Sequence, residues 1–319
     1  MTGANRDASS DTRGDMVNAV VLRGTGGVWQ VRDEEGRVRD ASLRGRLKQP
    51  EALKLAVGDE VRIEPDARGG EAWAIAEILP RRSQLARRAP GAAFGERVVA
   101  ANVDQVVAVF AAARPEPHCR MLDRFLVIAA ANDIPARIVI NKADLASGDA
   151  LAPFADYARA GYPLHATSVV SRTGLDELRL ALEGRVSALA GPSGVGKSSL
   201  LNTMYPGLGL RVGEISASVN KGRHTTVGAT MHPLPDGGYV MDTPGLREVG
   251  VWNVAPEELD RCFVEFRPYL GACRFRDCRH REEPGCAVRA ATAAGTVSRA
   301  RYESYLHLYD ELARAAPEW

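Results

Sequence analysis

The sequence GPSGVGKS, at residues 191–198, constrains the fold of this chain more than any other feature. It fits the pattern G-x-x-x-x-G-K-[S/T], follows the strand-like run VSALA and precedes the helical run KSSLLNTM. In this strand–loop–helix context, glycines let backbone N–H groups curl around a phosphate, which predicts a nucleoside triphosphate site. We expect Lys197 to contact the β- and γ-phosphates and Ser198 to bind Mg²⁺. The predicted phosphate-binding residues are Gly191, Pro192, Ser193, Gly194, Val195, Gly196, Lys197, Ser198 and Ser199.

A second motif, NKAD at residues 141–144, ends the buried β-like run ARIVI. The Asp144 carboxylate can accept hydrogen bonds from N1–H and the 2-amino group of guanine, whereas adenine offers an acceptor at N1 and no 2-amino group. We therefore predict a guanine site in which Asn141 holds the loop and Lys142 lies along the base, with Ala143 between Lys142 and Asp144. The segment LHATS predicts a further base-contacting loop, which acts through the backbone around Thr167 and Ser168.

Two later segments resemble the switches of a GTPase. In DTPG, at residues 242–245, we expect Asp242 to hold Mg²⁺ through water and the Gly245 N–H to face the γ-phosphate as catalytic groups. In KGRHTTVGAT, Thr225 or Thr226 is expected to close on the magnesium ion.

The residue after DTPG is Leu246, where many GTPases have a glutamine that orients water. Because leucine cannot orient water, we expect slow intrinsic hydrolysis. His224 is the candidate catalytic group for positioning water, and the alternative that it is only a polar loop residue stays open.

The order of these motifs differs from that of most GTPases, in which the phosphate loop comes first. Here the base reader and the base loop precede the phosphate loop and the two switches. Each half keeps its internal order, so a circular permutation of the chain explains the arrangement. We expect a mainly parallel sheet with helices on both faces and ligands at the carboxyl ends of its strands. The second switch then leads directly into the C-terminal region, so the nucleotide state can be transmitted there.

The segment CRFRDCRHREEPGC contains Cys273, Cys278, His280 and Cys286 in a C-x4-C-x-H-x5-C spacing. Three thiolates and one imidazole predict a closed tetrahedral zinc site, and the alternatives are reduced thiols or a disulfide. Four arginines interleave with these ligands and would present guanidinium groups to phosphates: Arg274, Arg276, Arg279 and Arg281.

Short β-like runs separated by turns, between Met16 and Pro80, predict a small barrel of the OB type. The role of this barrel is either RNA contact or purely structural. Trp29 and Trp73 are its only aromatic residues, and two are too few to indicate a platform on which RNA bases stack. The run RRSQLARRAPG, with four arginines, is typical of an exposed linker that is either solvated or in contact with RNA.

Further along, APEELDRCFVEF predicts an amphipathic helix with Cys262 on its core side. A stripe at helical spacing predicts core packing by Tyr302, Tyr305, Leu306, Tyr309 and Leu312.

A length of 319 residues allows two or three domains. With 41 Lys and Arg against 40 Asp and Glu, any affinity for nucleic acid must come from local basic patches. The polar start matches no signal peptide and no run is long enough to span a membrane, so we expect a cytoplasmic protein. The expected parts are a disordered tail (1–15), an OB-like β-barrel (16–80), a basic linker (81–91), a circularly permuted GTPase domain (92–250) and a zinc-binding domain (251–319).

Together these features resemble the RsgA (YjeQ) family of bacterial small ribosomal subunit biogenesis GTPases, over nearly the whole chain. The resemblance implies an OB-fold domain, a permuted P-loop GTPase domain and a zinc domain, with GTP or GDP, Mg²⁺ and one structural Zn²⁺ as cofactors. The resemblance also implies that residues 141–144 and 191–199 contact GTP, and that zinc is bound by Cys273, Cys278, His280 and Cys286. GRHTTV departs from the family's GRHTTT, so the magnesium ligand stays open between Thr225 and Thr226.

The same resemblance implies a role late in 30S assembly, with GTP hydrolysis stimulated by the subunit and 16S rRNA contacted through the barrel and zinc domains. We expect a monomer with neither DNA nor a membrane as partner. Two other classes stay open: a GTP-gated RNA-binding module unrelated to the ribosome, and a metabolic P-loop enzyme. The metabolic enzyme would need an acceptor pocket, for which the sequence gives no sign.

Overall fold

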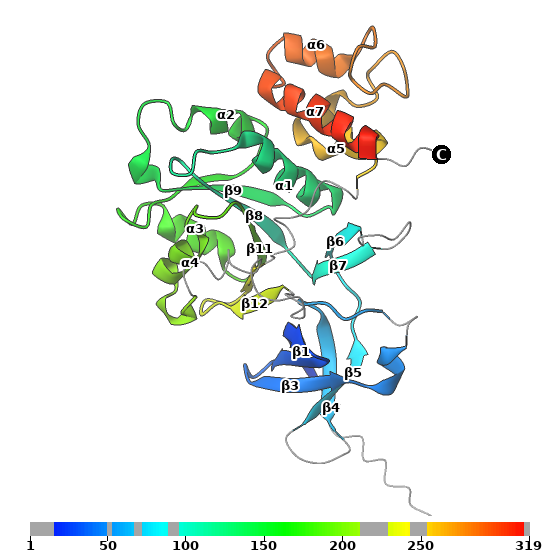
Figure 1. The fold of residues 1–319 in the computed structure, drawn as a ribbon, viewed down its shortest axis with the longest axis vertical. Coiled ribbons are helices and arrows are strands. Elements are labelled where there is room, and N and C mark those ends of the chain that lie inside the picture. The colour runs from blue at the N-terminus through cyan, green and yellow to red at the C-terminus, as the bar shows by residue number, and fades with distance from the viewer. Residues whose placement is uncertain are drawn as a thin grey trace, which may run out of the picture.

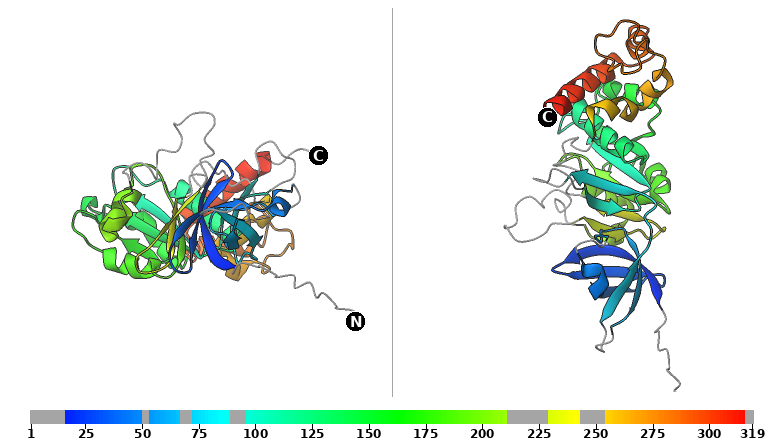
Figure 2. Two further views of the ribbon diagram at one scale, coloured as in Figure 1. Left: turned by 90° about the horizontal axis from the view of Figure 1, so that it is seen from below. Right: turned by 90° about the vertical axis from the view of Figure 1, so that its right-hand side faces the viewer.

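The computed structural model shows a barrel, a central α/β domain and a C-terminal helical module that follow one another along the long axis of the molecule (Figures 1 and 2). The structure describes residues 16–49, 53–66, 72–88, 96–210, 229–242 and 254–315. The expected tail at 1–15 lies outside these ranges. Within them, no helix combines the length and the apolar character needed to span a bilayer.

The N-terminal barrel is closed by five strands in the order β1-β2-β3-β5-β4, which confirms the predicted barrel. β1 pairs antiparallel with both β2 and β4, whereas β3 pairs parallel with β5. Alternation along the strands sends Val21, Val31, Val61, Ile63 and Ile75 into the interior, where all are fully buried. The elements are β1 (Val17–Thr25), β2 (Val28–Asp33), β3 (Val38–Leu43), η1 (Gly45–Lys48), β4 (Glu60–Pro65) and β5 (Trp73–Ile78).

Both tryptophans of the barrel take part in local packing. The Arg39 guanidinium lies 4.1 Å from the centroid of the Trp73 ring, and Arg39 donates to the buried carboxylate of Asp33 at 3.0 Å. The Trp29 ring lies so close to Gly24 that a Cβ atom there would come within 2.5 Å of it. These contacts favour the structural role of the barrel over a stacking platform.

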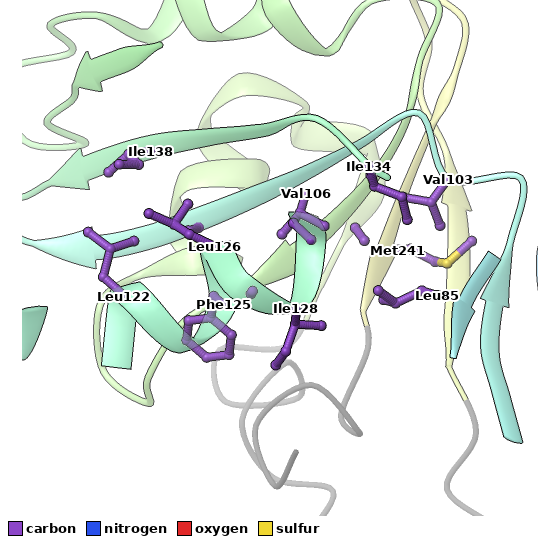
Figure 3. Close-up of a cluster of buried hydrophobic side chains, with 14 of the residues drawn as sticks. Leu85, Val103, Val106, Leu122, Phe125, Leu126, Ile128, Ile134, Ile138 and Met241 are labelled. Carbon is purple, nitrogen blue, oxygen red and sulfur yellow. The ribbon is translucent and has the colours of Figure 1, made fainter. Parts of the chain in front are cut away.

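The prediction of an exposed linker at residues 81–91 is wrong for residues 84–86, which are buried or half-buried, whereas Arg82 is exposed. Residues 84–88 form β6 (Gln84–Arg88), which pairs antiparallel with β7 (Glu96–Ala101). Leu85 and Ala86 are buried, and Leu85 belongs to the same apolar cluster as Met241 (Figure 3). The apolar contact of Leu85 therefore holds this segment against the α/β domain.

The first two arginines of this segment are neutralised by carboxylates. Arg81 forms a buried ion pair with Asp59 of the barrel at 2.7 Å, and Arg82 pairs with Asp104 of the α/β domain at 2.9 Å. Their side chains thus join the barrel to the α/β domain, and they do not form an open basic patch.

The central sheet has the strand order β10-β9-β8-β11-β13-β12, in which only β12 is antiparallel to its neighbour, so the predicted mainly parallel sheet is confirmed. β8, from the first half of the domain, pairs directly with β11, from the second half. The strands are β8 (Gln105–Ala111), β9 (Ala136–Asn141), β10 (Leu164–Ala166), β11 (Val186–Ala190), β12 (Thr230–Pro233) and β13 (Tyr239–Asp242).

Helices cover both faces of this sheet, as the permuted α/β fold requires. Along β8, Val106, Ala108 and Phe110 pack with α1 and α2 on one face, while Val107 and Val109 pack with α3 and α4 on the other (Figure 1). The helical elements are α1 (Cys119–Ala131), η2 (Ala143–Leu145), α2 (Ala152–Arg159), α3 (Leu175–Leu182), α4 (Lys197–Met204) and η3 (Pro206–Leu208).

The C-terminal module packs around aromatic side chains. The predicted continuous helix over APEELDRCFVEF is wrong, because the backbone is extended at Phe263 (φ −92°, ψ 99°). This break turns Phe263 and Phe266 inward, where their ring centroids lie 5.2 Å apart and both are fully buried. The elements are η5 (Pro256–Glu258), α5 (Leu259–Cys262), η6 (Val264–Tyr269), α6 (Ala287–Ala293) and α7 (Arg299–Ala315).

The predicted core residues of this module are confirmed. Tyr305 and Leu312 are buried, and the other residues of the stripe on α7 pack against the same cluster. Cys262 is buried as well, and burial raises the pKa of its thiol to about 12. Cys262 is therefore a neutral apolar residue of the core.

One buried cation joins the module to the α/β domain. Arg301 of α7 is 2% exposed and donates to Glu265 at 2.6 Å, while a second arm of its guanidinium pairs with Asp123 of α1. Tyr157 of α2 donates its hydroxyl to the same Asp123 carboxylate at 2.8 Å. Two carboxylates thus offset the cost of burying one guanidinium between the two parts.

We predict that Arg301→Leu lowers the free energy of unfolding by about 3–5 kcal/mol, because it leaves two buried carboxylates without their cation. The measurement is denaturant unfolding followed by circular dichroism. Arg299→Leu is the matched control, since Arg299 lies on the same helix and its side chain is 86% exposed. Equal stability losses in the two variants would show that the buried ion cluster is not needed.

Candidate nucleotide site and metal centre

The phosphate loop begins where β11 ends, and its glycines are required by close contacts. Gly191 has φ +134°, and a Cβ atom there would lie 2.0 Å from the Val109 carbonyl oxygen of β8. Gly196 has φ +94°, and its Cβ would lie 2.6 Å from Nδ2 of Asn141. Glycine at these two positions therefore lets the loop lie directly against β8 and the NKAD motif.

The residues that follow the loop start α4. Lys197 is buried, and its ammonium donates to the carbonyl oxygens of Gly191 at 2.8 Å and Pro192 at 2.7 Å. Ser198 is buried beside it in the first turn of the helix. The cation and the hydroxyl predicted to contact phosphate and magnesium thus lie together at the loop. Of the remaining predicted loop residues, Ser193, Gly194 and Val195 lie between β11 and α4, and Ser199 lies in the first turn of α4.

The NKAD motif contacts the phosphate loop directly, although the two are far apart in sequence. Asn141 donates its side-chain amide to the Val195 carbonyl at 2.8 Å, across 54 residues. Lys142, held at φ +58°, donates to the Gly194 carbonyl at 2.8 Å and also to the carbonyl of Arg114. The structure therefore brings the predicted base reader and the predicted phosphate loop into one site.

The predicted base loop joins the same site through its hydroxyl groups. Thr167 donates its hydroxyl to the Asn141 side chain at 3.2 Å, and its carbonyl accepts from the Ala143 N–H at 3.0 Å. The Ser168 hydroxyl donates to one oxygen of the exposed Asp144 carboxylate. The sequence indicated only backbone contacts for these two residues, so their side-chain roles were missed. A hydroxyl pair directly after a short strand is the signal that pointed to them.

Asp242 lies beside the start of the phosphate loop. It is the last residue of β13 and is paired with Leu189 of β11, and Leu189 precedes Gly191 by two residues. The other predicted switch and catalytic residues lie outside the described residues: His224, Thr225, Thr226, Gly245 and Leu246.

The predicted zinc ligands converge in the C-terminal module. The ligand atoms of Cys273, Cys278, His280 and Cys286 all lie within 4.8 Å of one another. Nδ1 of His280 lies 3.6 Å from the sulfurs of Cys273 and Cys278 and 3.3 Å from that of Cys286. Tetrahedral zinc with ordinary bond lengths separates sulfur and nitrogen ligands by about 3.6 Å, so these residues fit the ion.

Residues outside the cluster orient its ligands. Asp260 lies 3.3 Å from Nε2 of His280, the ring nitrogen turned away from the thiols. Tyr302 donates its hydroxyl to the His280 carbonyl at 2.6 Å, and Tyr305 donates to the Arg279 carbonyl at 2.9 Å. A carboxylate behind a histidine ligand fixes its orientation and raises its basicity. The sequence analysis predicted core packing for Tyr302 and Tyr305, but it assigned none of these three residues to the metal site.

The arginines of the zinc loop are not equivalent. Arg281 pairs with Asp310 of α7 at 2.9 Å, whereas Arg274 is exposed and its guanidinium lies 5.6 Å from the ring centroid of Phe275. Phe275 itself is 42% exposed, although it is a large apolar residue. The loop therefore presents an open aromatic ring beside a cation, a feature that the sequence analysis missed.

The strand order, the phosphate loop and the NKAD contacts define a circularly permuted P-loop GTPase. The sequence profile described as RsgA GTPase matches residues 78–252. The chain belongs to this RsgA GTPase family, as its resemblance predicted.

Relatives with this name match almost the whole chain. The small ribosomal subunit biogenesis GTPase RsgA of Gemmatimonas aurantiaca is 62% identical over 296 residues, which cover 92% of this chain and 96% of that protein. The protein of the same name from Moorella thermoacetica is 43% identical over 296 residues, which cover 93% and 97%.

Two solved structures share the fold. The crystal structure of YjeQ from Thermotoga maritima superimposes with a TM-score of 0.78 at 35% identity and covers 94% of this chain and 99% of its own. YloQ, described as a circularly permuted GTPase, has a TM-score of 0.75 at 28% identity and covers 99% and 100%. The predicted permutation is thus confirmed. The protein is an enzyme that hydrolyses GTP, and membership of the family implies that it binds a guanine nucleotide and Mg²⁺.

We predict that Asp144→Asn weakens GTP binding roughly tenfold to a hundredfold and creates affinity for XTP. The new amide donor would oppose the 2-amino group of guanine, but it can donate to the C2 oxygen of xanthine. Calorimetric titration with both nucleotides measures the change. Asp149→Asn is the control, since Asp149 is an exposed carboxylate on the same connection. Unchanged GTP affinity and no XTP binding in Asp144→Asn would remove the base-reading assignment.

For the metal centre we predict about one zinc per chain, and a zinc affinity about 10–100-fold lower in Asp260→Ala, which loses the partner of His280. Competition with a chromophoric chelator measures this affinity. Asp277→Ala is the control, because Asp277 is an exposed carboxylate of the same loop that is not a ligand. Equal zinc affinity in the two aspartate variants would leave Asp260 without a positioning role.

Cys278→Ser, which removes a zinc ligand, should lower the stability of the C-terminal module itself.

Proposed function

We propose that this protein acts late in the assembly of the small ribosomal subunit, in the cytoplasm, and that the 30S subunit stimulates its GTP hydrolysis. One observation carries the proposal: the relatives that match 92–93% of this chain bear the name of a small ribosomal subunit biogenesis GTPase. The match includes the barrel and the zinc module as well as the GTPase domain, so the parts available for binding a partner are shared too.

The nucleotide is held from two sides in this proposal. Asp144, oriented by the Ser168 hydroxyl, reads the guanine edge, and Asn141 fixes its loop to the phosphate loop. Lys197 neutralises charge on the β- and γ-phosphates as negative charge develops in the transition state. Ser198, Asp242 and either Thr225 or Thr226 would hold Mg²⁺, which when bound supplies further positive charge to the phosphates.

Hydrolysis needs an oriented water, and Leu246 has no group that can orient one. We assign the orientation of this water to His224, and the contact with the γ-phosphate to the N–H of Gly245. We propose that contact with the subunit positions both groups for hydrolysis. This requirement is the physical reason why turnover should depend on the subunit.

Contact with 16S rRNA is assigned first to the zinc loop. Exposed guanidinium groups bind phosphates, and an exposed aromatic ring such as Phe275 stacks on unpaired bases. The barrel is proposed as a second contact, although its tryptophans are engaged in packing. We propose a monomer with no DNA or membrane partner.

The test is GTP turnover by the protein alone, with purified 30S subunits, with 50S subunits, and with free rRNA. We predict slow turnover alone and an increase of about tenfold or more with 30S only. Equal rates with and without 30S would contradict the proposal. Equal stimulation by free rRNA would favour instead a GTP-gated RNA-binding module unrelated to the subunit.

For the role of the histidine, we predict that His224→Ala lowers the 30S-stimulated rate at unchanged GTP affinity, because it removes the group that positions water. Single-turnover hydrolysis and nucleotide titration separate the two quantities. A stimulated rate equal to that of the parent would reduce His224 to a loop residue.

A further inference from the structure

A pocket of about 510 Å³ opens at the edge of the central sheet opposite the nucleotide loops. Its lining includes Gln105 and Ala136, the first residues of β8 and β9, whereas the nucleotide loops follow the last residues of these parallel strands. Tyr162 and Val264 contribute apolar wall, and Arg137 and Arg185 contribute positive charge. The pocket is therefore separate from the GTP site and is bordered by both the α/β domain and the C-terminal module.

Arg137 is held in the pocket by neutral acceptors. Its Nε donates to Gln105 at 2.8 Å, and one terminal nitrogen lies 2.7 Å from Nε2 of His165. Gln105 is buried and is itself fixed, since its amide donates to Ala181 at 2.8 Å and Ser187 at 2.9 Å. The Arg137 guanidinium is thus half-buried and oriented, and within the described ranges no carboxylate pairs with it.

A second cation lies beside the first. Burial and the charge of Arg185 lower the pKa of Arg137, the direction expected for like charges with no anion between them. Arg185 is exposed, and its side chain makes no ion pair with any described residue. The one carboxylate of the lining, Asp104, is occupied by Arg82 at 2.9 Å and the Val186 N–H at 2.8 Å.

A third arginine lies beyond this pocket. Pro135, Ala136, Tyr162 and Val264 also line a neighbouring hollow of about 310 Å³, which contains Arg267 of the C-terminal module together with Asp133. Arg267 donates to the Arg261 carbonyl at 3.0 Å, and among the described residues it has no carboxylate partner. Three arginines therefore line two adjoining pockets that share part of their walls, which suits an extended anion better than a single small one.

We propose that this pocket binds a backbone phosphate of an RNA strand that runs along the sheet edge, with Arg137 and Arg185 as its ligands and the strand continuing toward Arg267. The inference rests on the proposed function, because that function supplies the RNA. Guanidinium groups donate two parallel hydrogen bonds to phosphate oxygens, and the apolar wall accommodates a ribose or a base.

The test is the affinity for 30S subunits, measured by co-sedimentation at several salt concentrations with a non-hydrolysable GTP analogue. Arg185→Glu is the main variant, because this side chain is exposed and makes no hydrogen bond or ion pair with the part of the chain that the structure describes. We expect affinity about tenfold lower and a salt slope reduced by about one, with unchanged basal GTP turnover. Arg137→Gln should act in the same direction, and Arg299→Glu, with an equal charge change at an exposed position of α7, is the matched control.

Equal subunit affinity in Arg185→Glu and Arg299→Glu would overturn the inference. Failure of the parent protein to bind 30S would instead contradict the proposed function itself. A second arm titrates pyrophosphate into protein saturated with GDP and Mg²⁺. Pyrophosphate binding that is lost in Arg185→Glu, without any effect on subunit affinity, would assign the pocket to a small free anion and overturn the RNA assignment.

Discussion

The parallel pairing of β8 with β11 is the interaction on which the nucleotide site depends. It aligns Gln105–Ala108 with Ser187–Ala190 and so joins the half of the domain that reads the base to the half that holds the phosphates. The carbonyl of Val109, just beyond the last pair, leaves room only for glycine at position 191. Asn141 of the next strand then reaches the phosphate loop. The order of the halves in sequence is therefore immaterial, provided that these two strands meet.

The parts that the sequence predicted are those encoded by local patterns. Each nucleotide motif follows its own apolar run, and the carboxyl end of a parallel strand is enough to place both motifs at the same edge. Short β-like runs separated by turns predicted a barrel, and the spacing from Cys273 to Cys286 predicted a metal centre, because both depend on residues close in sequence. The helical stripe on α7 belongs to the same category.

The parts that the sequence analysis missed depend on partners far apart in the chain. Arg81 and Arg82 were interpreted as part of an exposed basic run, yet their partners are Asp59 and Asp104, on either side of the segment. Asp260 acts on a histidine twenty residues away. Sequence composition cannot show such contacts. They matter most for charged residues, because a charged side chain is available to a binding partner only when no opposite charge lies beside it.

The buried Arg301 cluster has a mechanical consequence. The C-terminal module is joined to the GTPase domain by the chain that continues from β13, and again by the Arg301 contact with Asp123 on α1. Arg124 of α1 also pairs with Glu311 of α7, and Val127 of α1 packs in the apolar core of the module. The module is therefore attached along α1 and not at a single point. α1 also starts soon after Arg114, whose carbonyl accepts the Lys142 ammonium of the base reader. A change at the base reader that displaces α1 would therefore displace the C-terminal module with it.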